Sequence, residues 1–166
     1  AELKLIQSEP IEKPRKVRWR NLVPHSQTWA FALGKFLTDP IWWFYLFWSG
    51  KFVNERFGVD IKSIGLPLII IYLLADVGSI AGGWFSSALL KQGWSPNASR
   101  KTAMLACALC VLPVFFASRI EALWPAVLVI GLAASAHQGF SANLFTLVSD
   151  TVPGAGAVNP TFPIGG

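Results

Sequence analysis

The sequence predicts an all-α integral membrane protein with four transmembrane helices. Hydrophobic residues make up 53% of its 166 residues, and charged residues make up only 14%, against about 25% in a typical soluble domain. Its eight Trp and twelve Phe residues are typical of the aromatic belts at membrane interfaces. Four apolar stretches, each close to the roughly 20 residues needed to cross a bilayer, are joined by short connections. A soluble domain seldom contains four such segments.

The four stretches lie between a basic N-terminal segment and a tail rich in Pro and Gly. Residues 1–27 are expected to form a basic cytoplasmic linker, and residues 28–150 a four-helix membrane segment. We expect the spans at about 28–48, 65–90, 102–118 and 122–148. Residues 151–166 contain Pro and Gly throughout, which predicts an irregular tail.

The basic residues are distributed unevenly around these spans. If the N-terminus is cytoplasmic, most Lys and Arg residues, including the run KPRKVRWR, lie on the cytoplasmic side. This is the positive-inside bias of membrane proteins. The net charge of +5 therefore reflects topology and predicts no nucleic-acid partner. A phospholipid-binding patch is the alternative interpretation of the basic run.

No residue pattern indicates an enzyme, a metal site or a cofactor. Cys107 and Cys110 share a face of the third span, but they have no second pair and no nearby His, so we expect packing thiols. The sequence contains no phosphate-binding glycine loop, no paired catalytic carboxylates and no nucleophile elbow.

The first span carries charged residues within its apolar stretch. Lys35 and Asp39 are four residues apart, so they share a helix face and can pair, and Trp42 lies close to Lys35 on that face. Pro40 removes one backbone donor and favours a kink. A charged pair beside a helix break is typical of an ion or substrate site. The alternative is a pair that only neutralises itself within the membrane.

The second span combines an isolated acid with a glycine ridge. Gly78 and Gly82 form a G-x-x-x-G pattern that lets another helix approach closely. Asp76 either carries a proton or bonds to a facing helix. The third span has no charged residue, so we expect it to face lipid or to pack passively.

The fourth span has hydrogen-bonding side chains at its centre. His137, Gln138 and Ser141 share a helix face with Phe145, whereas Asn143 lies on another side and is expected to bond to a neighbouring helix. The polar face predicts either interhelical hydrogen bonds or the lining of a cavity that holds a hydroxylated solute.

Three stretches, GKFLTDPIWWFYLFW, ADVGSIAGGWFSSALLKQGWSPNASRKT and GLAASAHQGFSANLFTLVSD, resemble a known family. They are similar to the second half of a major facilitator superfamily transporter, within the anion:cation symporter family and its hexuronate (galacturonate/glucuronate) transporters. The resemblance implies that the four spans are helices seven to ten of twelve, and that residues 1–27 are the central cytoplasmic loop. The chain would then be a fragment without the N-terminal half and the last two helices. Helices seven and ten would line the cavity, eight would meet the other half, and nine would lie outside.

The resemblance implies a proton-coupled importer of hexuronates or related sugar acids that works by alternating access in the bacterial inner membrane. Its partners would be a sugar-acid anion, protons and the lipid bilayer. The alternative is a non-transporting membrane module, either a sensor or a truncated remnant. The candidate residues for binding substrate in the cavity are His137, Gln138, Ser141, Asn143, Trp42, Trp43 and Tyr45. The candidates for proton coupling or a charge pair are Lys35, Asp39 and Asp76.

Arg100 and Lys101 match the basic pair in the family's loop between helices eight and nine. Ser86 and Ser87 stand where that family commonly has an Asp, which puts the corresponding gating contact in doubt.

Overall fold

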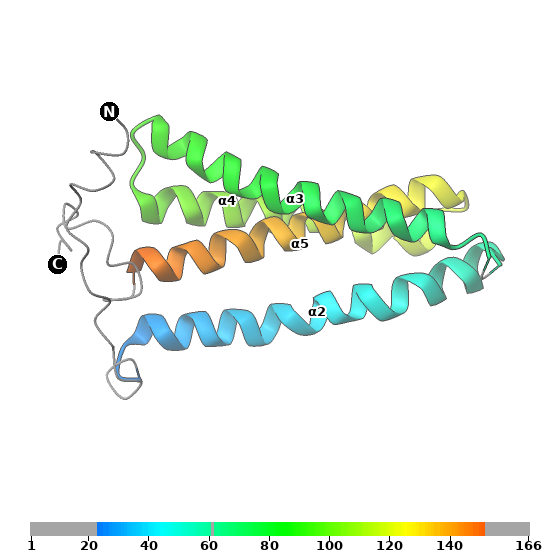
Figure 1. Cartoon of the computed structure of the whole chain (residues 1–166), viewed down its shortest axis with the longest axis horizontal. Helices are drawn as coiled ribbons and strands as arrows, with labels where there is room; N and C mark the ends of the chain where they lie inside the picture. Colours follow the sequence, from blue (N-terminus) through cyan, green and yellow to red (C-terminus); the bar gives the residue numbers. More distant parts are fainter. Residues whose placement is uncertain (1–22, 61, 152–166) are drawn as a thin grey trace, which may run out of the picture.

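The computed structural model describes residues 23–60 and 62–151, with side chains described as far as residue 148, and this part of the chain is almost entirely helical (Figure 1). Helix α2 spans Ser26–Phe57, α3 spans Gly65–Lys91, α4 spans Pro96–Val111, the 3-10 helix η2 spans Leu112–Arg119, and α5 spans Leu123–Thr151. No strand occurs within the described ranges. The prediction of an all-α fold is confirmed. The predicted linker and tail lie almost entirely outside the described residues.

Three helical segments are long and apolar enough to cross a membrane: Gly65–Lys91, Pro96–Arg119 and Leu123–Val148. Helix α2 is also long, but it is not among them within the described part of the chain. It carries two charged pairs, Lys35 with Asp39 and Lys51 with Glu55. Large apolar side chains such as Phe36, Ile80 and Phe115 are exposed on the outside of the bundle, where lipid or further helices would cover them.

Two helix ends differ from the expected span limits because polar residues extend the helices beyond their apolar parts. Helix α2 continues past residue 48 and ends only where Gly58 adopts a left-handed conformation, with φ of 64°. Helix α4 begins at Pro96, ahead of the expected start at residue 102, because the Ser95 hydroxyl accepts a hydrogen bond from the Ala98 backbone. At the other end, Pro113 lacks a backbone N–H, and the α4 segment continues as η2.

Helix α5 is the centre of the bundle and contacts α2, α3, α4 and η2 (Figure 1). The α3–α5 contact is the closest. A Cβ atom placed on Gly78 would lie 2.2 Å from the Ser135 carbonyl oxygen, and one on Gly82 would lie 2.6 Å from the Gly139 Cα. The predicted glycine ridge is therefore confirmed as the surface on which α3 and α5 meet, backbone against backbone.

The end of α3 is joined to the start of α4 by a side-chain contact. The Arg100 guanidinium donates a hydrogen bond of 2.6 Å to the hydroxyl of Ser86, a fully buried residue. Ser86, which stands where the family commonly has an Asp, is thus a neutral acceptor for Arg100. Lys101 is exposed.

Candidate functional site

The polar residues of α2 and α5 face each other along one line of contact, which we call the α2–α5 seam. The two helices run in opposite directions (Figure 1), so residues later in α2 meet residues earlier in α5. Three steps make up the seam: Phe31 with Phe145, Lys35 with Ser141, and Thr38 and Trp42 with His137. The two polar faces that the sequence predicts separately are therefore one site.

Lys35 lies at the middle step of the seam and makes three contacts. Its ammonium forms an ion pair with Asp39 at 2.5 Å, donates to the Ser141 hydroxyl at 3.2 Å, and lies 4.5 Å from the centre of the Phe145 ring. The cation is thus held by a carboxylate, a hydroxyl and an aromatic face. The predicted pairing of Lys35 with Asp39 is confirmed. The helix continues through Pro40, which follows this pair.

His137 forms the next step and is tied to α2 on two sides. Its Nε2 lies 2.8 Å from the Thr38 carbonyl oxygen. Because a carbonyl only accepts hydrogen bonds, Nε2 must carry the hydrogen. The imidazole also stacks on the Trp42 indole, with ring centres 6.0 Å apart and planes 13° apart. The other nitrogen, Nδ1, is buried and has no hydrogen-bond partner among the described residues.

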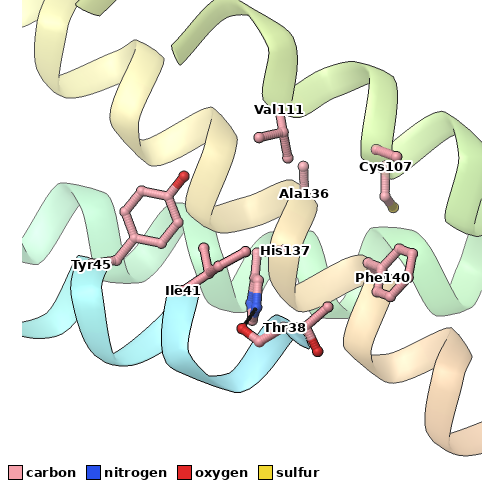
Figure 2. Close-up of a pocket in the computed structure, with 9 residues that line it drawn as sticks. Thr38, Ile41, Tyr45, Cys107, Val111, Ala136, His137 and Phe140 are labelled. Atoms are coloured by element: carbon pink, nitrogen blue, oxygen red, sulfur yellow. Dashed lines mark hydrogen bonds between the residues drawn. The ribbon is translucent and has the colours of Figure 1, made fainter. Parts of the chain in front are cut away.

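A small pocket opens on the α4 side of the seam. Figure 2 shows the side chains that line it: Thr38, Ile41 and Tyr45 from α2, His137 and Phe140 from α5, and Cys107 and Val111 from α4. The cavity has a volume of about 230 Å³. Its lining is largely apolar. Tyr45, a candidate substrate residue, lies in this pocket and in the apolar core instead of on the polar seam. Cys107 packs close to Gly139.

Gln138 and Asp39 lie toward the opposite, α3-facing side of the seam. On α5, Gln138 is about 100° from His137. This direction falls between the side that contacts α2 and the side, marked by Ser135, that contacts α3. On α2, Asp39 is rotated toward the same side as Leu46, whose carbonyl accepts a hydrogen bond from the Tyr72 hydroxyl of α3.

The remaining candidate residues lie outside the seam. Trp43 is exposed and stacks on Phe47 of its own helix. Asp76 is exposed on the side of α3 that faces away from α5 and forms no ion pair with any described residue. No group of three or more His, Cys, Asp or Glu residues that could hold a metal occurs in the part of the chain described.

Asn143 lies in the α3–α5 contact, as its position on the helical wheel predicts. Its side-chain amide is fully buried and donates hydrogen bonds of 2.9 Å to the carbonyls of Gly82 and Gly139. The inclusion of Asn143 among the cavity-lining candidates is therefore corrected: this amide joins two helices, because the glycine ridge leaves a carbonyl of α3 within its reach.

Two residues that α2 contributes to the seam, Phe31 and Thr38, are absent from the candidates that the sequence indicates. Phe31 contacts Phe145, with ring centres 5.7 Å apart, and Thr38 offers its carbonyl to His137. Both lie at helical spacing from Lys35, so the periodicity of α2 could have identified them. Their side chains look like ordinary packing residues, and only the partner helix gives them a role.

The contacts of Asn143 lead to a test of folding. Asn143→Asp should lower the free energy of unfolding by about 1–3 kcal/mol, because a carboxylate cannot donate to the two carbonyls and would instead repel them. Gln138→Glu, the same change one and a half turns earlier on α5, should have a much smaller effect. Thermal unfolding of the purified full-length protein measures both. Equal losses of stability in the two variants would contradict the assigned role of Asn143.

Comparison with known proteins identifies the family. The model of the Major Facilitator Superfamily matches residues 2–164. The "Hexuronate transporter" of Escherichia coli (strain K12) is 26% identical over 142 residues, covering 84% of this chain and 33% of that protein. The "Probable L-galactonate transporter" of the same strain is 29% identical over 116 residues, covering 69% of this chain and 26% of that protein.

A third relative, the "Probable galactarate/D-glucarate transporter GarP" of E. coli (strain K12), is 28% identical over 134 residues, which is 81% of this chain and 30% of that protein. The chain thus spans about a third or less of the length of these relatives. No solved structure matches the chain significantly. All three relatives are named as transporters. This chain belongs to the Major Facilitator Superfamily.

Proposed function

We propose that the chain forms part of a proton-coupled transporter that imports hexuronates or related sugar acids across the bacterial inner membrane. The relatives named above are described as transporters of hexuronate, L-galactonate or galactarate/D-glucarate, and all of these substrates are sugar acids. Residues 1–27 would lie on the cytoplasmic side. The described helices would form one wall of the transport site, and helices outside the chain would form the other.

The observation that carries this proposal is the position of Lys35. A sugar acid combines a carboxylate with several hydroxyl groups, so its site needs a cation beside side chains that donate and accept hydrogen bonds. The seam offers the Lys35 ammonium next to the Ser141 hydroxyl, and the Gln138 amide lies toward the same side of α5. Lys35 contacts α5, which is long and apolar enough to cross a membrane, and a cation placed among membrane-spanning helices is a mark of a functional site.

Alternating access requires that this wall moves as a unit. The backbone contact of Gly78 and Gly82 with α5 makes α3 and α5 one rigid pair, because neither helix can shift without breaking a closely packed surface. The α2–α5 contact depends more on side chains, including the Lys35–Ser141 and His137–Thr38 hydrogen bonds, one ring stack and one aromatic pair. We propose that rocking of the wall exposes the seam to one side of the membrane and then to the other.

Uptake of labelled galacturonate by cells that produce the full-length protein tests this function. Cells that produce the protein should accumulate the sugar acid, and a proton uncoupler should abolish the accumulation. Labelled galactonate and glucarate, assayed in the same cells, show whether the protein takes up related acids. Absence of uptake of all three acids, or accumulation that the uncoupler does not reduce, would contradict the proposal.

A further inference from the structure

We infer that Asp39 is the group that couples transport to protons. In this exchange the Lys35–Asp39 ion pair opens, Lys35 pairs with the carboxylate of the substrate, and Asp39 takes up a proton. The inference rests on the proposed function, because it requires a substrate that carries a carboxylate. It assigns the coupling to one of the three candidate charged residues.

The two members of the ion pair are held very differently. The Lys35 side chain is 18% exposed and keeps its contacts with Ser141 and Phe145 if the carboxylate leaves. The Asp39 side chain is 49% exposed, and Lys35 is its only ion-pair partner among the described residues. An incoming carboxylate would therefore find a fixed ammonium whose present counter-ion can move away.

The exchange conserves charge at the site. Before binding, the ammonium of Lys35 is balanced by the carboxylate of Asp39. After binding, the substrate carboxylate balances Lys35, and Asp39 is left without a partner within a membrane segment, where an unpaired charge is costly. A proton from hydronium in the cavity water then forms an O–H bond on Asp39 and removes that charge. On the other side of the membrane the substrate leaves, Asp39 returns its proton to water, and the ion pair forms again.

The other described groups around the pair do not compete for this role. On α5, His137 already donates a hydrogen bond to the Thr38 carbonyl and stacks on the Trp42 ring. From α3, the Tyr72 hydroxyl donates to the Leu46 carbonyl at 3.3 Å. Asp76 lies on the far side of α3. An exchange in which Asp39 alone carries the proton predicts one proton for each monoanionic sugar acid and no net movement of charge.

The test uses full-length protein in proteoliposomes and compares two assays. One is accumulation of labelled galacturonate driven by a pH gradient, and the other is exchange of labelled for unlabelled galacturonate without a gradient. Asp39→Asn should reduce driven accumulation by at least about tenfold, because the amide takes up no proton, while exchange persists. Asp76→Asn is the matched control and should retain both activities. Asp39→Glu should restore part of the coupling.

Several outcomes would overturn the inference. These are accumulation by Asp39→Asn equal to that of the wild type, loss of exchange in a correctly folded Asp39→Asn protein, and loss of coupling in Asp76→Asn alone. If Asp39→Asn does not fold, the number of protons transported with each galacturonate by the wild type tests the inference instead. A ratio of one proton per galacturonate and indifference to the membrane potential support the inference, and a higher ratio overturns it. Failure of the wild type to exchange any sugar acid would instead refute the proposed function.

Discussion

Replacing Gly78 with Leu should prevent the full-length protein from accumulating in folded form. The reason is that even a single Cβ atom at this position would lie 2.2 Å from both the carbonyl oxygen and the hydroxyl oxygen of Ser135, and the backbone of α5 cannot give way. Overpacking of a well-packed interior usually costs about 1–3 kcal/mol, and a whole isobutyl group against backbone should exceed that range. Size-exclusion chromatography of the detergent-solubilised protein measures the folded fraction.

Gly83 provides the matched control, because it lies in the same helix and a Cβ atom placed there would have no neighbour within 4 Å. Gly83→Leu should give a folded yield near that of the wild type. Similar yields for the Gly78 and Gly83 variants would show that α3 and α5 do not meet on the glycine ridge.

Replacing Lys35 with Met should reduce uptake of sugar acids by about tenfold or more, because it removes the part-buried cation that would receive the substrate carboxylate, and a hydrogen bond to a charged group is worth about 1.5–3 kcal/mol. Met keeps the length and apolar stem of the side chain but cannot receive a carboxylate. Lys35→Arg should recover part of the activity, since it restores the cation with a different geometry. Initial rates of labelled galacturonate uptake, normalised to the amount of folded protein, give the comparison.

Lys51→Met is the control for this variant. Lys51 is also in α2 and also pairs with an acid four residues later, but it is exposed near the end of the helix. Its replacement should leave uptake nearly unchanged. An equal loss of uptake in Lys51→Met and Lys35→Met would show that uptake does not depend specifically on the α2–α5 seam.

Much of the fold is predictable because the residues of each helix alone are enough to predict that helix and how closely another helix can pack on it. Long apolar stretches predict helices in a membrane, and the G-x-x-x-G spacing of Gly78 and Gly82 predicts a close helix contact whatever the partner is. The ends of α2 and α4 were harder to predict. A search for apolar stretches stops where charges begin, whereas Gly58 and Ser95 set the helix ends through backbone conformation and capping.

The site is predictable only in part, because a helical wheel shows which residues share a face but not which helix that face meets. The wheel correctly separates Asn143 from His137 and Ser141, and the spacing correctly pairs Lys35 with Asp39. It cannot show that Lys35 donates to Ser141, since these residues are far apart in sequence and meet only when α5 packs on α2. Tyr45 illustrates the same limit: it shares α2 with the charged pair but turns toward α4.

The most direct test of the central proposal is calorimetric titration of the purified full-length protein with galacturonate and with galactose, its neutral counterpart. If Lys35 receives the carboxylate, the wild type should bind galacturonate clearly more tightly than galactose. Lys35→Met should lose this preference, with its affinity for galacturonate lowered by at least about tenfold and its affinity for galactose unchanged. Equal affinity of the wild type and of folded Lys35→Met for galacturonate would contradict the proposal that the α2–α5 seam is the carboxylate site.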